Sequence, residues 1–188
     1  RLARALERAL GPADGESSRL AARLERCELL AAAEDGARLR EVAPPVIAAL
    51  EDLRAHEPLA ELERALGRLD PGERSDDRHE HRRREVEARF RAGQDERAAR
   101  LLRRLIDKGV GRWPRLVEAA LWRRLAEHHV VATGDALARP ALTRARVALE
   151  AASEAPPGTP AGVIESSPDV ALERARLAAV AAELHLAA

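Results

Sequence analysis

The stretch LAELERALGRLD, residues 59–70, carries Leu59, Leu62, Leu66 and Leu69. Steps of three, four and three residues place all four side chains on one stripe of an α-helix, the pattern of helices that pack along their length. A similar stripe precedes it, formed by Leu39, Val42, Val46, Leu50 and Leu53. The two stripes predict an all-α fold, an elongated antiparallel helical bundle or rod with spectrin-like or coiled-coil-like packing.

The composition of the 188-residue chain favours helices throughout. It contains one Phe, two Trp, no Tyr and no Met, so the interior must consist mainly of Leu, Val and Ala. Strong helix formers dominate, whereas β-branched residues are sparse and never alternate with polar residues over the length of a strand. We therefore expect essentially no β-structure.

The charges are balanced, with 32 basic and 32 acidic residues, which argues against a nucleic-acid partner. No apolar run approaches the roughly 18 residues of a membrane helix, and no basic-then-apolar leader is present, so we expect no membrane partner. Cys27 is the only cysteine, which excludes an intrachain disulfide. These features predict a protein of the cytoplasm or of another reducing aqueous compartment.

Breaker residues divide the chain into segments. Pro58 and Pro168 suit the first turn of a helix, whereas Pro44-Pro45 predicts a break. We expect helices over roughly 1–10, 18–35, 38–56, 58–69, 76–108, 114–131, 135–152 and 168–188, with an elongated bundle over 1–152 and a connector rich in Pro, Gly and Ser over 153–167. The longest helix would span roughly 48 Å at ~1.5 Å per residue, which favours an elongated bundle.

The stretch DRHEHRRREVEARF, residues 77–90, holds the densest cluster of charged residues. His79 and His81 lie two positions apart, hence about 200° apart around a helix, so they cannot converge on one metal ion. Nearby glutamates offset much of the positive charge of the arginines. We interpret the stretch as a solvated helix face, with a polar contact surface for a protein partner and a metal or nucleic-acid site as alternatives.

The other reactive side chains also favour structural roles. Cys27 lies on a core stripe and is expected to be a buried, small hydrophobic residue. His128 falls on the apolar stripe of its helix, so we expect it to be half-buried near the helix C-terminus, with His129 facing elsewhere. No nucleotide-binding, hydrolase or metalloprotease motif occurs. We therefore predict no catalytic, cofactor-binding or metal-binding residues and no cofactor.

The candidate contacts with protein partners are apolar. Because the chain has few large side chains, some leucine stripes should remain uncovered by its own helices, and Leu59, Leu62, Leu66 and Leu69 are the first candidates. They predict a weak homodimer. Leu62→Glu would dissociate this dimer if the stripe is the interface, and would unfold the chain if the stripe is internal. Trp113 and Trp122 are expected to lie in one helix-hairpin core, and an exposed Trp would mark a partner-binding spot.

The sequence resembles the central helical region of alphaherpesvirus large tegument proteins. The resemblance lies in segments such as RLARALERAL (1–10), LAELERALGRLD (59–70) and DVALERARLAAVAAELHLAA (169–188), in the absence of Asn, and in Lys108 as the only lysine, as in a G+C-rich gene. It implies a structural linker within a virion protein, located in the virion tegument and the host cytoplasm. The cysteine protease of that family would lie outside this piece, and Cys27 matches no part of it.

The sequence therefore predicts a non-enzymatic scaffold or spacer that acts through contacts with protein partners. The chain begins with Arg1 rather than Met, so we expect a segment of a larger protein. The alternative is a bacterial helical-repeat adaptor, similar to tetratricopeptide-repeat proteins, that binds a peptide in a groove. An enzyme is the third possibility.

Overall fold

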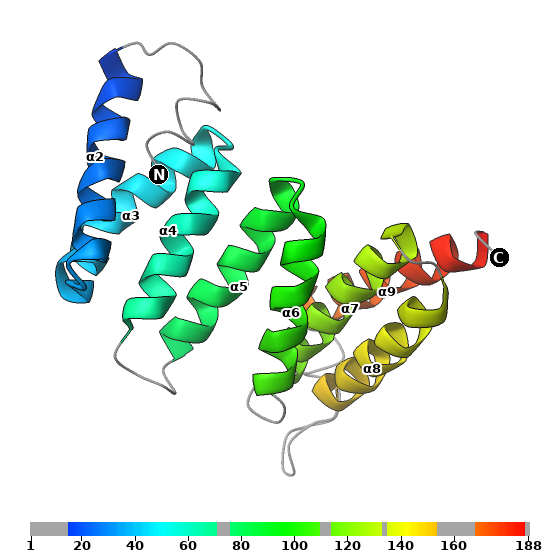
Figure 1. The fold of residues 1–188 in the computed structure, drawn as a ribbon. Coiled ribbons are helices and arrows are strands. Elements are labelled where there is room, and N and C mark those ends of the chain that lie inside the picture. The colour runs from blue at the N-terminus through cyan, green and yellow to red at the C-terminus, as the bar shows by residue number, and fades with distance from the viewer. Residues whose placement is uncertain (1–14, 71–75, 110–113, 133–134, 154–167, 187–188) are drawn as a thin grey trace. The chain divides into compact units, whose positions relative to one another are not determined.

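The computed structural model describes residues 15–70, 76–109, 114–132, 135–153 and 168–186. In these ranges every regular element is an α-helix, which confirms the predicted all-α class (Figure 1). The helices are α2 (Gly15–Ala32), α3 (Gly36–Asp52), α4 (His56–Leu69), α5 (Asp76–Arg91), α6 (Asp95–Gly109), α7 (Arg115–Ala132), α8 (Asp135–Ser153) and α9 (Pro168–Leu186). The expected helix over 1–10, residues 154–167 of the connector, and Trp113 lie outside the described residues.

The chain forms two compact units, Arg1–Leu101 and Leu102–Ala188, which we call unit 1 and unit 2. The division therefore falls within α6, whereas the sequence analysis placed a single bundle over 1–152 and a separate helix over 168–188. The C-terminal helix α9 belongs to unit 2, where it packs against both α7 and α8. This packing arises because apolar side chains of α7, α8 and α9 form one buried cluster.

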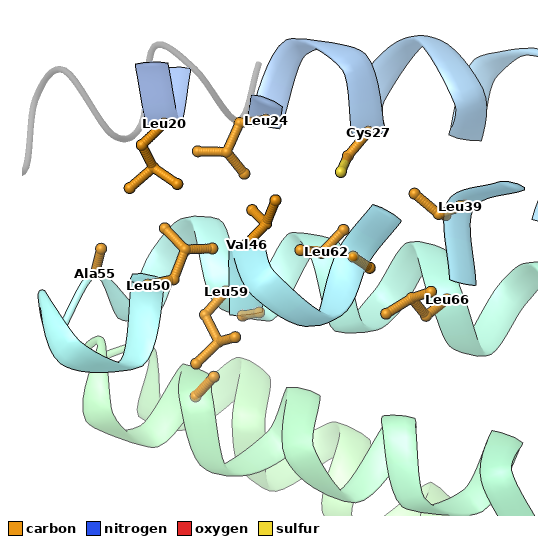
Figure 2. Close-up of a cluster of buried hydrophobic side chains, with 13 residues drawn as sticks. Leu20, Leu24, Cys27, Leu39, Val46, Leu50, Ala55, Leu59, Leu62 and Leu66 are labelled. Carbon is orange, nitrogen blue, oxygen red and sulfur yellow. The ribbon is translucent and has the colours of Figure 1, made fainter. Parts of the chain in front are cut away.

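The core of unit 1 is a leucine-rich layer shared by α2, α3 and α4 (Figure 2). Leu24 and Cys27 of α2 point toward Leu39 and Val46 of α3, and Leu62 of α4 lies beside them. The periodic stripes of the sequence thus meet one another within the unit. Each fully buried aliphatic side chain contributes about 1.5–3 kcal/mol through removal from water, so this layer is the main stabilising feature of unit 1.

The core of unit 2 depends on small side chains. Ala138, Ala141 and Ala145 of α8 are buried against α7, and α7 with α8 forms the most extensive helix pair of the unit. Alanine lets two helix axes approach closely and loses no side-chain entropy on burial. Val170, Leu177, Val180 and Leu184 of α9 supply the larger apolar groups.

The single helix expected over 76–108 is wrong, because two helices, α5 and α6, occupy this range. Gly93 ends α5 with a φ of 71°, in the left-handed region that a residue with a side chain enters only with strain. The amide of Gly93 bonds to the carbonyl of Phe90, and that of Gln94 bonds to Arg89. The apolar periodicity continues from Phe90 to Ala98 across this turn, so periodicity alone does not reveal the break.

The predicted break at Pro44-Pro45 is also wrong, because both prolines lie inside α3. Each proline removes one helical hydrogen bond, which costs about 3 kcal/mol in an ordinary helix interior. Both lie on the exposed side of α3, where water can bond to the freed carbonyl groups, while Val46 and Leu50 continue the buried side. Pro58 occupies the first turn of α4, as predicted.

Three of the links between helices share one conformation. Glu34, Arg54 and Gly93 follow α2, α3 and α5, and their φ angles are 57°, 52° and 71°. In each link the next amide bonds to a carbonyl five residues earlier, in the pairs Asp35 to Leu30, Ala55 to Leu50, and Gln94 to Arg89. This is the Schellman ending of a helix, and it turns the chain directly into the next helix.

Candidate functional site

The leucine stripe of α4 is internal to unit 1. Leu59, Leu62 and Leu66 are at most 5% exposed, and Leu69 is partly buried against the same core. Their assignment as contacts with a partner is therefore wrong for this fold. The reason is that α4 packs against α2, α3 and α5, so its own unit already covers the stripe.

Trp122 lies partly buried against the core of unit 2. The guanidinium carbon of Arg144 on α8 lies 4.6 Å from the centroid of its ring, a cation–π contact between α7 and α8. The ring of Trp122 therefore contacts Arg144 and the core of its own unit. Trp113, its predicted neighbour in the hairpin core, lies outside the described residues.

The charged stretch of α5 is partly buried, which corrects its interpretation as a solvated face. His81 places Nδ1 2.6 Å from Oε2 of Glu63 on α4, and the side chains of His81 and Glu63 are 18% and 1% exposed. Gly67 of α4 lies against His81, and a Cβ at Gly67 would lie 3.4 Å from the Cβ of His81, an ordinary contact distance. The stretch thus forms the side of α5 that packs against α4, and these two helices are the most extensive helix pair of unit 1.

Arginines of α5 continue this cluster toward solvent. Arg84 places Nη1 3.9 Å from Oε1 of Glu63 and donates through Nε to Glu80 at 3.0 Å, and Arg83 donates two hydrogen bonds to Glu80 at 2.8 Å. The bond from Arg83 is the main reason that the pKa of Glu80 lies below its usual value. In the described part of the chain, no three His, Cys, Asp or Glu side chains gather into a potential metal site.

A second charged cluster surrounds Arg89, whose side chain is completely buried. Its guanidinium donates to Glu85 at 2.8 Å, to Gln94 at 2.8 Å and to Glu61 of α4 at 2.9 Å. Burial alone would raise the pKa of Glu61, but the hydrogen bond and charge of Arg89 bring that pKa below its usual value. Arg89 therefore links α4 to α5 and to Gln94, the residue that precedes α6.

Unit 2 contains a comparable cluster between α7 and α9. Arg123 of α7 donates to Glu173, which is buried on α9, and to Glu127 on its own helix. Burial lowers the pKa of Arg123, but these two carboxylates outweigh burial and hold it above its usual value. The ion pair selects one alignment of α9 against α7, because the two charges must meet in a mostly buried interface.

His128 of α7 is partly buried, as the sequence predicts, whereas the burial of His129 was not expected. His129 is the buried one, at 4% exposure, and His128 is only partly buried. Nη2 of Arg103 lies 2.9 Å from Nε2 of His129. The sequence places His128 on the apolar stripe, but the buried Leu121, Leu125 and His129 follow one another at four-residue steps, so His129 lies on the buried side of α7.

Cys27 is buried in the unit 1 core at 1% exposure, as predicted. Burial raises the pKa of its thiol, which opposes the thiolate form that a nucleophile needs. The buried charges, in contrast, were missed by the sequence analysis. The available signals were the four-residue spacing of Glu85 and Arg89 and that of Arg123 and Glu127, which suit ion pairs on one helix.

In comparisons with known proteins, no protein family matches the sequence, and no curated protein or solved structure is significantly similar to it. Of the helices in the described ranges, none combines the length and the apolar character needed to cross a bilayer. The arrangement of the polar groups is therefore the main guide to function. They form interhelical ion pairs of Arg89 with Glu61 and of Arg123 with Glu173, and a hydrogen bond between His81 and Glu63.

Proposed function

We propose that the chain is a non-enzymatic structural scaffold or spacer segment of a larger protein and acts through protein–protein contacts. The observation that carries this proposal is the use of buried charges to join helices. Arg89 of α5 bonds to Glu61 of α4 and to Gln94 just before α6, and Arg123 joins α7 to α9. Such pairs oppose sliding and rotation of one helix on another, which suits a structural spacer.

Exposed apolar side chains support a role in protein contacts. Val147 and Leu137 of α8 are 60% and 47% exposed, and Leu172 of α9 is 50% exposed. They replace the buried leucines of α4 as candidate contacts, including those of a weak homodimer. The resemblance to alphaherpesvirus tegument proteins supports the virion tegument and the host cytoplasm as the place of action.

Two solution measurements test the proposal. Small-angle scattering should give a radius of gyration well above the roughly 16 Å expected for a compact chain of this length. A compact value contradicts the spacer role. Sedimentation equilibrium should show a weak monomer–dimer equilibrium that Val147→Glu shifts toward monomer, with Arg146→Glu on the same exposed side of α8 as the control for the added charge.

The second candidate function is a helical-repeat adaptor that binds a peptide. The shared conformation of the links at Glu34, Arg54 and Gly93 favours it, because repeat proteins stack similar helix–turn units. Selection from a displayed peptide library separates the two functions. A convergent peptide motif that protects one face of the chain from hydrogen exchange identifies an adaptor, and failure to converge favours the spacer.

A further inference from the structure

The contact between Arg103 of α6 and His129 of α7 has a chemistry that depends on pH. The two side chains belong to unit 2, and Nη2 of Arg103 lies 2.9 Å from Nε2 of His129. A guanidinium has only donors and keeps its charge at all ordinary pH values. Nε2 must therefore accept the hydrogen bond, which requires a neutral imidazole with its proton on Nδ1.

Protonation of His129 would destroy this contact. An imidazolium carries an N–H at both ring nitrogens, so Nε2 could no longer accept the hydrogen bond from Arg103. Two donors would then face each other. The new positive charge would also face the charge of Arg103 in an interior where His129 is only 4% exposed. His129 would lose the hydrogen bond that Nε2 accepts and would be repelled by the charge of Arg103.

The surroundings of His129 oppose protonation. Burial is the main reason that its pKa lies below the usual value, and the charge of Arg103 and the neighbouring His128 act in the same direction. The ring centroids of His128 and His129 lie 5.5 Å apart. Helices α8 and α9 also pack against α7. A histidine in the last turn of a helix usually gains from the dipole, but here burial and the charge of Arg103 oppose protonation.

We propose that the Arg103–His129 pair is an acid-sensitive contact that joins α6 to α7 near neutral pH and is released when the imidazole takes up a proton. Because the pKa is lower in the folded chain, the unfolded chain binds more protons just below its own pKa of about 6.5. The stabilisation is therefore complete above this pH and is lost as the pH falls through the lower value of the folded state. Acidification of a compartment would loosen this part of unit 2.

Hydrogen exchange tests the proposal locally, which matters because His56 of unit 1 also has a lowered pKa, chiefly through burial. After correction for intrinsic exchange rates, amides of α7 should lose protection by about tenfold for each pH unit over which only the open form is protonated. His129→Gln keeps an acceptor but cannot titrate, so its protection should stay constant from pH 7.5 to about 5. His128→Gln, the matched control, should keep most of the pH dependence of the wild type.

Nitrogen NMR of the histidine side chains gives a second test that does not require a variant to fold. At pH 7.5 the wild-type chain should show His129 as the neutral form with the proton on Nδ1, and its titration midpoint should lie below that of free histidine. A proton on Nε2 at this pH would overturn the proposal. An equal loss of α7 protection in the wild type and in His129→Gln would overturn it as well.

Discussion

Replacement of Arg89 by methionine should destabilise unit 1 more than any other single loss of charge there. The guanidinium is completely buried and bonds to Glu61, Glu85 and Gln94 at 2.8–2.9 Å. Methionine fills a similar volume but leaves Glu85, itself 6% exposed, as a buried charge without its arginine. Removal of one partner from a buried ion pair costs about 3–5 kcal/mol, and we expect a loss of stability in this range.

Two readouts can measure this loss. Urea unfolding followed by circular dichroism gives the shift of the midpoint. Cys27 provides a native-state probe of unit 1, because it is the only cysteine and is 1% exposed. If the thiol reacts only from an opened form of the unit, a loss of 3–5 kcal/mol corresponds to a roughly 10²–10⁴-fold faster reaction.

Matched variants separate the lost ion pair from other effects. Arg64→Met removes an arginine from a partly exposed pair with Glu61 at 3.4 Å and should cost less than about 1 kcal/mol. The double variant Arg89→Met/Glu85→Leu removes the orphaned charge and should recover much of the loss. If Arg89→Met costs no more than Arg64→Met, or if the double variant is no more stable than Arg89→Met, the assignment of Arg89 as the link between these helices is incorrect.

Two further pairs of substitutions test the packing of unit 1. Leu62→Glu should unfold the unit rather than dissociate a dimer, because Leu62 is fully buried, whereas Leu29→Glu, at a side chain that is 66% exposed, should leave the circular dichroism spectrum and urea midpoint nearly unchanged. Gly36→Ala should cost about 1–3 kcal/mol in urea unfolding, since its Cβ would meet the carbonyl oxygen of Leu69 at 2.7 Å. Gly93→Ala meets no neighbour within 4 Å and should cost only the strain of its positive φ, about 1 kcal/mol. A larger loss for Gly93→Ala than for Gly36→Ala would contradict this description.

The all-α class could be predicted because apolar spacing records which side of a helix is buried. Leu39, Val46 and Leu50 lie on the stripe that the spacing of α3 indicates, and all three are at most 1% exposed. Spacing does not record what covers the stripe. A second copy of the chain and a neighbouring helix satisfy Leu62 equally well in hydrophobic terms, so the sequence could not distinguish a dimer interface from a core.

Helix boundaries were predictable only where local chemistry and packing agree. At Pro168 they agree, and α9 begins there. At Pro44-Pro45 local chemistry predicts a break, but continuous burial of the opposite side of α3 outweighs it. At Gly93 the apolar spacing predicts a continuous helix, but the chain turns there. A single glycine is a weak signal within a helical pattern, so the sequence does not reveal this turn.

The buried charges show a different limit of periodic patterns. Arg89 is completely buried, whereas the adjacent Phe90 is only partly buried, although the apolar pattern selects Phe90 for the interior. The choice depends on Glu61, which lies 28 positions earlier and bonds to Arg89 only after α4 and α5 have packed. An arginine enters an interior when enough acceptors converge on it to replace its water. That convergence is a property of the packed helices, so the charged face of α5 could be interpreted only once its partner helix was known.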